Sequence, residues 1–187
     1  ANVLMTAEDC PSGTARIASV IDQLKGDLIV NVQADEPLMT GSIIDKIVEC
    51  LEKTEADVAT PVFRIVDADD LTNTNVNKVV CGSDGRALYF SRSPIPHVRD
   101  QDILEWTKCV AFWGHIGVYG FRRAVLEGYL ELPEGLLESA EKLEQLRLLE
   151  AGKQIFTVEV DYRPFGVDVP TDLVKVREIM ERSSVDV

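Results

Sequence analysis

The sequence lacks long apolar runs and is short of basic side chains. No apolar run approaches the roughly 18 residues that a membrane-spanning helix needs, so we expect no membrane partner. Lysine and arginine total 19 against 32 acidic residues, which gives a formal net charge of −13. Such a chain repels phosphate at long range, which argues against binding to nucleic acid or to an anionic membrane surface.

Cysteine is also scarce, and the four cysteines at positions 10, 50, 81 and 109 form no C-x-x-C pair. This scatter favours reduced thiols of a cytoplasmic protein over a zinc site or a disulfide framework. The composition, 45% hydrophobic and 27% charged, is typical of a globular protein. A chain of this length can bury one sizeable core, and we expect a single domain over residues 1–187.

The first third of the chain alternates between strand and helix patterns. We predict strands at residues 2–5, 28–33 and 57–65. We predict helices from a cap at Thr14 to about Gln23 and from a cap at Thr40 or Ser42 to about Leu51. A βαβαβ order implies parallel strands with right-handed crossovers, so the expected fold is α/β with a mostly parallel sheet.

The pattern changes after Asp70. Residues 77–81 and 86–91 flank Asp84-Gly85, a strong hairpin signal. A strand at 111–121, helices at 122–130 and 137–151, a strand at 155–160 and a helix at 170–181 follow. We therefore expect an inserted hairpin region at about residues 76–121 of the α/β domain.

Two aspartates are candidates for holding a charged ligand. Asp35 follows the apolar strand at 28–33, and open α/β sheets bind ligands beyond the carboxyl ends of their strands. Asp168 lies between a glycine and the start of the last helix, where an aspartate can also serve the helix N-terminus. Two such carboxylates would suit Mg²⁺ in a nucleotide enzyme.

His115 and Tyr119 are candidates for a binding face. In a continuous strand they lie two steps apart on one face, with Gly117 between them leaving room for a ligand. A buried pair satisfied by the backbone is an equally good interpretation.

Four other polar residues carry weaker signals. Glu144 and Gln145 flank a stripe of leucines, and an ordinary surface helix explains them more simply. Arg16 and Arg92 could bind anionic groups, although a surface position is the commoner explanation for a single arginine.

Six stretches of the chain occur in a familiar order and spacing. They are CPSGTAR, VNVQADEP, ALYFSRSPIP, HIGVYGFR, LEQLRLLEAG and GVDVPTDL. In this combination, from about Asn2 to Arg182, the chain resembles the 3-deoxy-manno-octulosonate cytidylyltransferases, or CMP-Kdo synthetases.

The resemblance implies a Rossmann-like nucleotidyltransferase domain that forms homodimers through the hairpin region. It implies Mg²⁺-dependent transfer of CMP from CTP to the acid sugar Kdo, with release of pyrophosphate, for lipopolysaccharide synthesis. It implies that Asp35 and Asp168 bind the metal. It also implies nucleotide contacts at Ser12, Thr14 and Arg16, and sugar contacts at Gln33, Arg92, His115, Tyr119, Glu144 and Gln145.

The chain also departs from the pattern of this family. Ala34 stands where the family usually has glycine, and Val169 where it often has a capping threonine. The family's basic loop, of the type A-R-x-x-S-T-R-L-P-G-K, has no match, so we expect an N-terminally incomplete domain. Two alternatives remain, a CMP-sialic acid synthetase and a non-catalytic truncated remnant, and HIGVYGFR with LEQLR favours Kdo over sialic acid.

Overall fold

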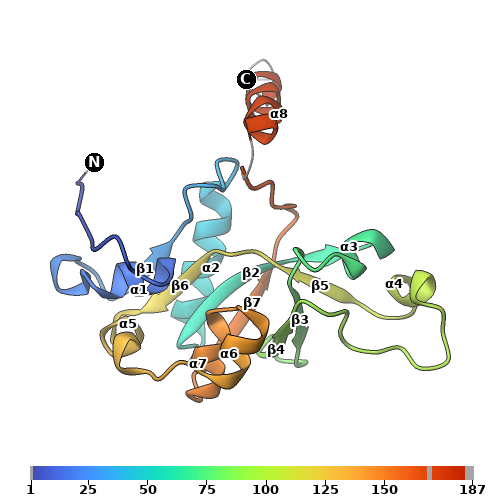
Figure 1. Cartoon of the computed structure of the whole chain (residues 1–187), viewed down its shortest axis with the longest axis horizontal. Coiled ribbons are helices and arrows are strands. Elements are labelled where there is room, and N and C mark those ends of the chain that lie inside the picture. Colours follow the sequence, from blue (N-terminus) through green and yellow to red (C-terminus); the bar gives the residue numbers. More distant parts are fainter. Residues whose placement is uncertain (1, 168–169, 184–187) are drawn as a thin grey trace.

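A seven-stranded sheet organises the computed structural model, which describes residues 2–167 and 170–183 (Figure 1). The strands are β1 (Leu28–Asn31), β2 (Val58–Ile65), β3 (Lys78–Cys81), β4 (Ala87–Ser91), β5 (Phe112–His115), β6 (Tyr119–Arg122) and β7 (Ile155–Glu159). Their order is β1-β6-β2-β5-β3-β4, and β7 pairs with β2 outside this path.

Short helices surround the sheet. They are α1 (Gly13–Ala18), α2 (Gly41–Lys53), α3 (Ala68–Thr72), α4 (Trp106–Cys109), α5 (Arg123–Glu127), α6 (Leu136–Glu141), α7 (Gln145–Glu150) and α8 (Pro170–Ser183). Single 3₁₀ turns occur at Ile21–Gln23, Ile103–Glu105 and Tyr129–Glu131. In Figure 1, α1 and α5 lie at one end of the sheet and α3 and α4 at the other, while α8 stands away from it. None of the described helices combines the length and apolar character needed to cross a membrane.

The α/β class is confirmed, but the prediction of a mostly parallel sheet is wrong. Both β1 and β2 pair antiparallel with β6, so they run in the same direction, yet β6 lies between them. Among the pairings of the described strands, only β2 with β7 is parallel. An apolar run indicates that a strand is buried, but it does not indicate which strand pairs with it. The sequence therefore could not show that β6 lies between β1 and β2.

Several boundaries differ from those predicted. Residues 2–5 form no strand, and Val3 and Met5 are largely exposed. The helix predicted over 137–151 is two helices, because Lys142 adopts a left-handed conformation (φ 54°) between α6 and α7. The strand predicted over 111–121 is interrupted at 116–118. The hairpin of β3 and β4 around Asp84-Gly85 is confirmed.

The core has one cluster on each face of the sheet. Ile43, Ile47 and Leu51 of α2 pack against one face, as the helical spacing predicts. They approach closely because β6 has Gly120 there: a Cβ at this position would lie 2.4 Å from Cγ2 of Ile47. The other face holds Tyr119 and Leu146, among others, so α7 and its polar neighbours lie over the middle of the sheet.

Candidate active site

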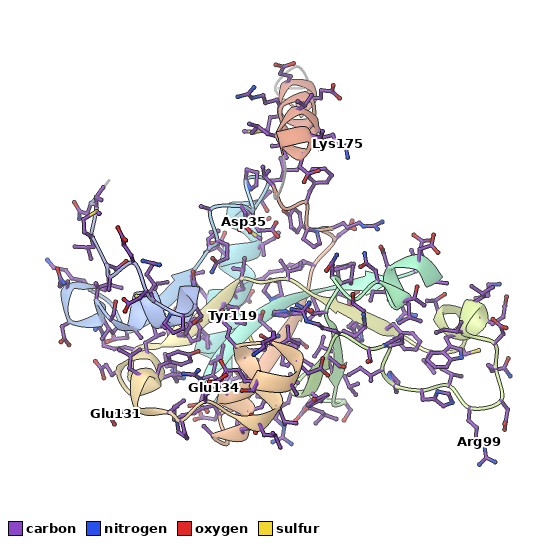
Figure 2. The ribbon with its side chains drawn as sticks, in the orientation of Figure 1. Asp35, Arg99, Tyr119, Glu131, Glu134 and Lys175 are labelled. Atoms are coloured by element: carbon purple, nitrogen blue, oxygen red, sulfur yellow. The ribbon has the colours of Figure 1, made fainter. Side chains whose placement is uncertain are left out.

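A cleft of ≈ 460 Å³ opens between the start of α1 and the junction of α6 with α7. Its lining residues are Pro11, Ser12, Tyr119, Glu134, Glu138, Lys142, Leu143, Glu144, Gln145 and Arg147. Four of the predicted site residues, Ser12, Tyr119, Glu144 and Gln145, therefore meet in one cavity although they come from distant parts of the chain. Figure 2 shows Tyr119 near the centre of the molecule, between Asp35 and Glu134 in this view.

Tyr119 and Gln145 form a buried pair in the floor of this cleft. The Tyr119 hydroxyl donates to Oε1 of Gln145 at 3.1 Å, and the Gln145 side chain is 2% exposed. Burial raises the pKa of Tyr119 well above its ordinary value, so the hydroxyl stays protonated and can donate. Nε2 of Gln145 is buried and has no hydrogen-bond partner within residues 2–167 and 170–183. An unpaired buried donor costs about 1–3 kcal/mol, which a bound acceptor could recover.

Glu144 links this pair to the start of α1. Its carboxylate accepts the backbone N–H of Thr14 at 3.4 Å. Ser12, and not Thr14 as predicted, caps α1: its Oγ accepts the Ala15 N–H at 3.1 Å. Because the cap lies two residues earlier, Thr14 is the second residue of the helix itself. Thr14 is also buried. The structure thus brings Ser12, Thr14 and Glu144 together.

His115 lies close to this pair but lines a second cavity and not the first. Its ring centroid is 5.4 Å from that of Tyr119, so the two predicted neighbours do meet despite the interruption between β5 and β6. His115 is 6% exposed, and burial lowers its pKa to about 3, so the imidazole is neutral. The second cavity, of ≈ 260 Å³, is lined by His115 together with Glu36, Gly117 and Gly166 among others.

Gln33 lies in the loop after β1, and its side chain packs beside Gly13 at the start of α1. Its Nε2 donates to Oδ1 of Asn31 at 3.1 Å. Gly13 permits this approach, because a Cβ there would lie 2.6 Å from the same nitrogen. Nδ2 of the buried Asn31 has no hydrogen-bond partner in the described part of the chain. Sequence reasoning missed Asn31, although a polar residue inside the apolar run at 28–33 was a usable signal.

Asp35 is exposed on the loop after β1. Its backbone carbonyl accepts the Val167 N–H at 3.0 Å, which draws the chain up to Val167 alongside it. Asp168, the second predicted metal carboxylate, and Val169 lie outside the described residues. No cluster of three or more His, Cys, Asp or Glu suited to a metal ion occurs among the described residues. Asp35 itself offers the hard oxygen that Mg²⁺ prefers.

The two predicted arginines do not line the cleft formed by the described residues. The guanidinium of Arg92 donates to the backbone carbonyls of Glu141, Thr74 and Lys142 at 2.7, 3.0 and 3.3 Å. It thereby holds the α6–α7 junction, which leads into Glu144 and Gln145. Arg16 donates to Oγ1 of Thr6 and the carbonyl of Ala7, at 2.5 and 2.9 Å, and so holds the segment before α1.

The cleft also contains an ion pair that sequence reasoning missed. Arg147 donates to both carboxylate oxygens of Glu138, at 2.6 and 3.0 Å, and the side chains are only 15% and 12% exposed. The two residues are nine positions apart on different helices, so helical spacing could not reveal the pairing. The pair fixes α7 against α6 and so supports the helix that carries Gln145.

Comparison with known proteins agrees with this geometry. Residues 1–155 match the Cytidylyltransferase family. Two 3-deoxy-manno-octulosonate cytidylyltransferases are similar over most of the chain. That of Pelobacter propionicus is 43% identical over 93% of this chain and 71% of its own, and that of Thermodesulfovibrio yellowstonii 39% identical over 91% and 70%.

A solved structure is similar as well. It is a CMP:2-keto-3-deoxy-manno-octonic acid synthetase complexed with CTP, with a TM-score of 0.87 and 37% identity over 96% of this chain and 72% of that one. Structures with much lower identity share the fold alone, for example HddC from Yersinia pseudotuberculosis at 14% and a TM-score of 0.58. From the sequence and structural matches together, this chain belongs to the 3-deoxy-manno-octulosonate cytidylyltransferase family of nucleotidyltransferases.

Proposed function

We propose that this protein transfers CMP from CTP to 3-deoxy-manno-octulosonate (Kdo), giving CMP-Kdo and pyrophosphate for lipopolysaccharide synthesis. The domain is of the Rossmann-like nucleotidyltransferase type. The names of the similar proteins support Kdo as the acid sugar rather than sialic acid.

One observation carries the proposal: the cleft and the neighbouring second cavity each have a lining residue with a buried polar atom that no described residue satisfies. Nε2 of Gln145 is a free donor and Nδ1 of the neutral His115 is free, and Tyr119 lies against both residues. Most buried polar atoms in proteins have a hydrogen-bond partner, so these two atoms are open to a bound ligand or an ordered water. A sugar acid carries several hydroxyls and a carboxylate, so it could satisfy donors and acceptors together.

In this proposal Tyr119, Glu144 and Gln145 hold the sugar from the α7 side and His115 from the β5 side. Gln33 contacts it from the loop after β1. Arg92 acts on this group through the α6–α7 junction, because its guanidinium is already bonded to three carbonyls. In this proposal the sugar is bound by the neutral side chains of Tyr119, Gln145, His115 and Gln33 together with the carboxylate of Glu144.

Ser12, Thr14 and Arg16 form the nucleotide side in the same proposal. Ser12 caps α1, and Thr14 and Arg16 lie within this helix. Ser12 reaches the cleft directly, while Arg16 orders the segment at Thr6 and Ala7 beside it. A nucleotide bound here would lie next to the sugar, as transfer between them requires.

Asp35 would hold Mg²⁺, together with Asp168. The exposed carboxylate of Asp35 fits this role, because it follows a sheet strand and is not engaged by any described group. When bound, Mg²⁺ would activate the sugar hydroxyl and offset charge developing on the phosphate. The protein's part is to bind and orient the two substrates, and no covalent protein intermediate is required.

The direct test is pyrophosphate release from CTP in the presence of Mg²⁺, with Kdo and sialic acid compared as acceptors. We expect turnover with Kdo and much less with sialic acid. Preference for sialic acid would replace the proposed substrate, and no turnover with either acid would leave the chain as a non-catalytic member of its family.

We also propose that the protein forms a homodimer through the region at 76–121. In Figure 1 the part of this region around α4 extends away from the rest of the sheet. The region at 76–121 exposes Leu88 on β4 and, on either side of α4, Leu104 and Val110, which are 56%, 63% and 39% exposed. Exposed apolar side chains are a feature of protein–protein interfaces. Light scattering at tens of micromolar should give the mass of a dimer, and Leu104→Glu should shift it toward the monomer.

A further inference from the structure

Thr60 of β2 is the centre of a buried hydrogen-bond cluster to which sequence reasoning assigned no role. It is fully buried, and its Oγ1 lies 2.7 Å from the carbonyl oxygen of Val118, 3.2 Å from that of Ile116 and 2.9 Å from Nε2 of His115. The two carbonyls belong to the interruption between β5 and β6. The hydroxyl therefore joins this interruption to the histidine ring.

The direction of each bond follows from the chemistry of the groups. A carbonyl oxygen can only accept, so the single hydroxyl proton of Thr60 points to Val118, the nearer carbonyl. The Thr60 oxygen then has lone pairs left for His115, and Nε2 of His115 must supply the proton. Because burial keeps this imidazole neutral, with its pKa lowered to about 3, Nδ1 carries no proton.

Nδ1 is therefore a bare acceptor, and it has no partner in the described chain although the residue is 94% buried, being 6% exposed. We propose that Thr60 is a positioning residue which holds His115 in the Nε2–H tautomer, so that Nδ1 accepts a hydrogen bond from a hydroxyl of the acid sugar and disfavours its carboxylate. This inference rests on the proposed function for the identity of the ligand, but its first part concerns the free protein alone.

The backbone of His115 is held by the neighbouring strand. Asn77 accepts the backbone N–H of His115 at 2.8 Å, and the side-chain Oδ1 of Asn77 is also buried without a partner among the described residues. The unpaired Nδ1 of His115 disfavours a carboxylate as its partner, because a carboxylate can only accept. The free Nε2 donor of Gln145, across Tyr119, is the better place for the carboxylate. The sugar would thus bind in one orientation.

The tautomer can be measured without any substrate. The chain has only two histidines, His97 and His115, so a spectrum of protein labelled with ¹⁵N in the imidazole rings contains two sets of signals. His97→Gln assigns them. We expect His115 to show protonated Nε2 and unprotonated Nδ1 at neutral pH. Protonated Nδ1 in the wild-type protein would overturn the proposal.

Thr60→Val removes the hydroxyl at nearly constant volume, whereas Thr60→Ser keeps the hydroxyl and removes only the methyl group. We expect the tautomer signature of His115 to be lost in the first variant and kept in the second. Thr157→Val is the matched control, because Thr157 pairs with Thr60 across β2 and β7 and its hydroxyl donates to Gly85 and not to a histidine. A change of tautomer in Thr157→Val equal to that in Thr60→Val would show a general packing effect and overturn the role of Thr60.

The sugar contact is tested on the same samples. Adding Kdo should shift Nδ1 of His115 more than Nε2, and the KM for Kdo should rise about tenfold in Thr60→Val, as expected for one lost hydrogen bond. Turnover and the KM for CTP should change less than about twofold. Kdo binding without a shift at Nδ1 would overturn the sugar contact. If calorimetry detects no Kdo binding at all, the proposed function has failed, while the tautomer result still decides the role of Thr60.

Discussion

The two ends of the proposed site are built differently. At the sugar end, Tyr119, Gln145 and His115 are all buried, and each is held by a hydrogen bond to another protein group. At the metal end, Asp35 is exposed on a loop and is anchored through its backbone by the Val167 N–H. One end is fixed before the ligand arrives, and the other offers a charge to solvent.

This difference separates binding from chemistry. Buried neutral groups choose a ligand by the direction of hydrogen bonds, and they cost stability when left unpaired. An exposed carboxylate contributes little to folding, and its value lies in binding a cation during the reaction. Variants at the two ends should therefore fail in different ways, the metal end in turnover and the sugar end in stability and sugar affinity.

The largest effect is expected at Asp35. Asp35→Asn keeps the shape of the side chain and removes the charge, so turnover should fall by a factor on the order of 10² or more. The melting temperature should stay unchanged, because the carboxylate supports no described contact. Pyrophosphate release at several Mg²⁺ concentrations measures this, with Asp45→Asn on the exposed side of α2 as the control. Near-normal rates of the Asp35 variant at low Mg²⁺ would contradict the metal assignment.

The next largest effect is expected in the pH dependence of stability, and it comes from His115. Burial lowers its pKa from 6.5 to about 3, so between these values the unfolded chain binds a proton that the folded chain does not. The free energy of unfolding must therefore decrease as the pH falls through this window. We expect a loss of about 2 kcal/mol from this group between pH 7 and pH 5.

Urea unfolding at the two pH values, compared between the wild type and His115→Gln, isolates this contribution from that of the carboxylates. The variant should lose less stability than the wild type on acidification. Equal losses in the two proteins would mean that His115 is not held neutral, and the contrast between the two ends would disappear.

The smallest effect is expected at Gln145. Gln145→Ala removes the free Nε2 donor and leaves the Tyr119 hydroxyl without its acceptor, so the KM for Kdo should rise about tenfold. The KM for CTP should change less, because the nucleotide side lies at α1. Gln154→Ala, at an exposed glutamine, is the control. A larger loss of CTP affinity than of Kdo affinity would mean that Gln145 contacts the nucleotide and not the sugar.

Much of the fold could be predicted from local patterns. The formation of α2 and of the hairpin at Asp84-Gly85 depends mainly on residues close together in the chain, and both predictions are confirmed. The pairing of strands is not local. β6 enters between β1 and β2 from a distant part of the chain, and Lys142 divides a run of helical residues into two helices. The apolar patterns that predict buried strands and helices indicate neither the position of β6 in the sheet nor the break at Lys142.

The site divides in the same way. The sequence alone determined which residue types were available: carboxylates after a strand, a histidine near a tyrosine, and Glu144-Gln145 beside the leucine stripe. Only the tertiary structure decided that Thr14 meets Glu144 across 130 positions and that Tyr119 donates to Gln145. It also decided that Thr60, an ordinary threonine in an apolar strand, orients His115. Hydrogen bonds depend on distances of a few tenths of an ångström between groups far apart in the chain, and only packing of the whole sheet with its helices fixes such distances.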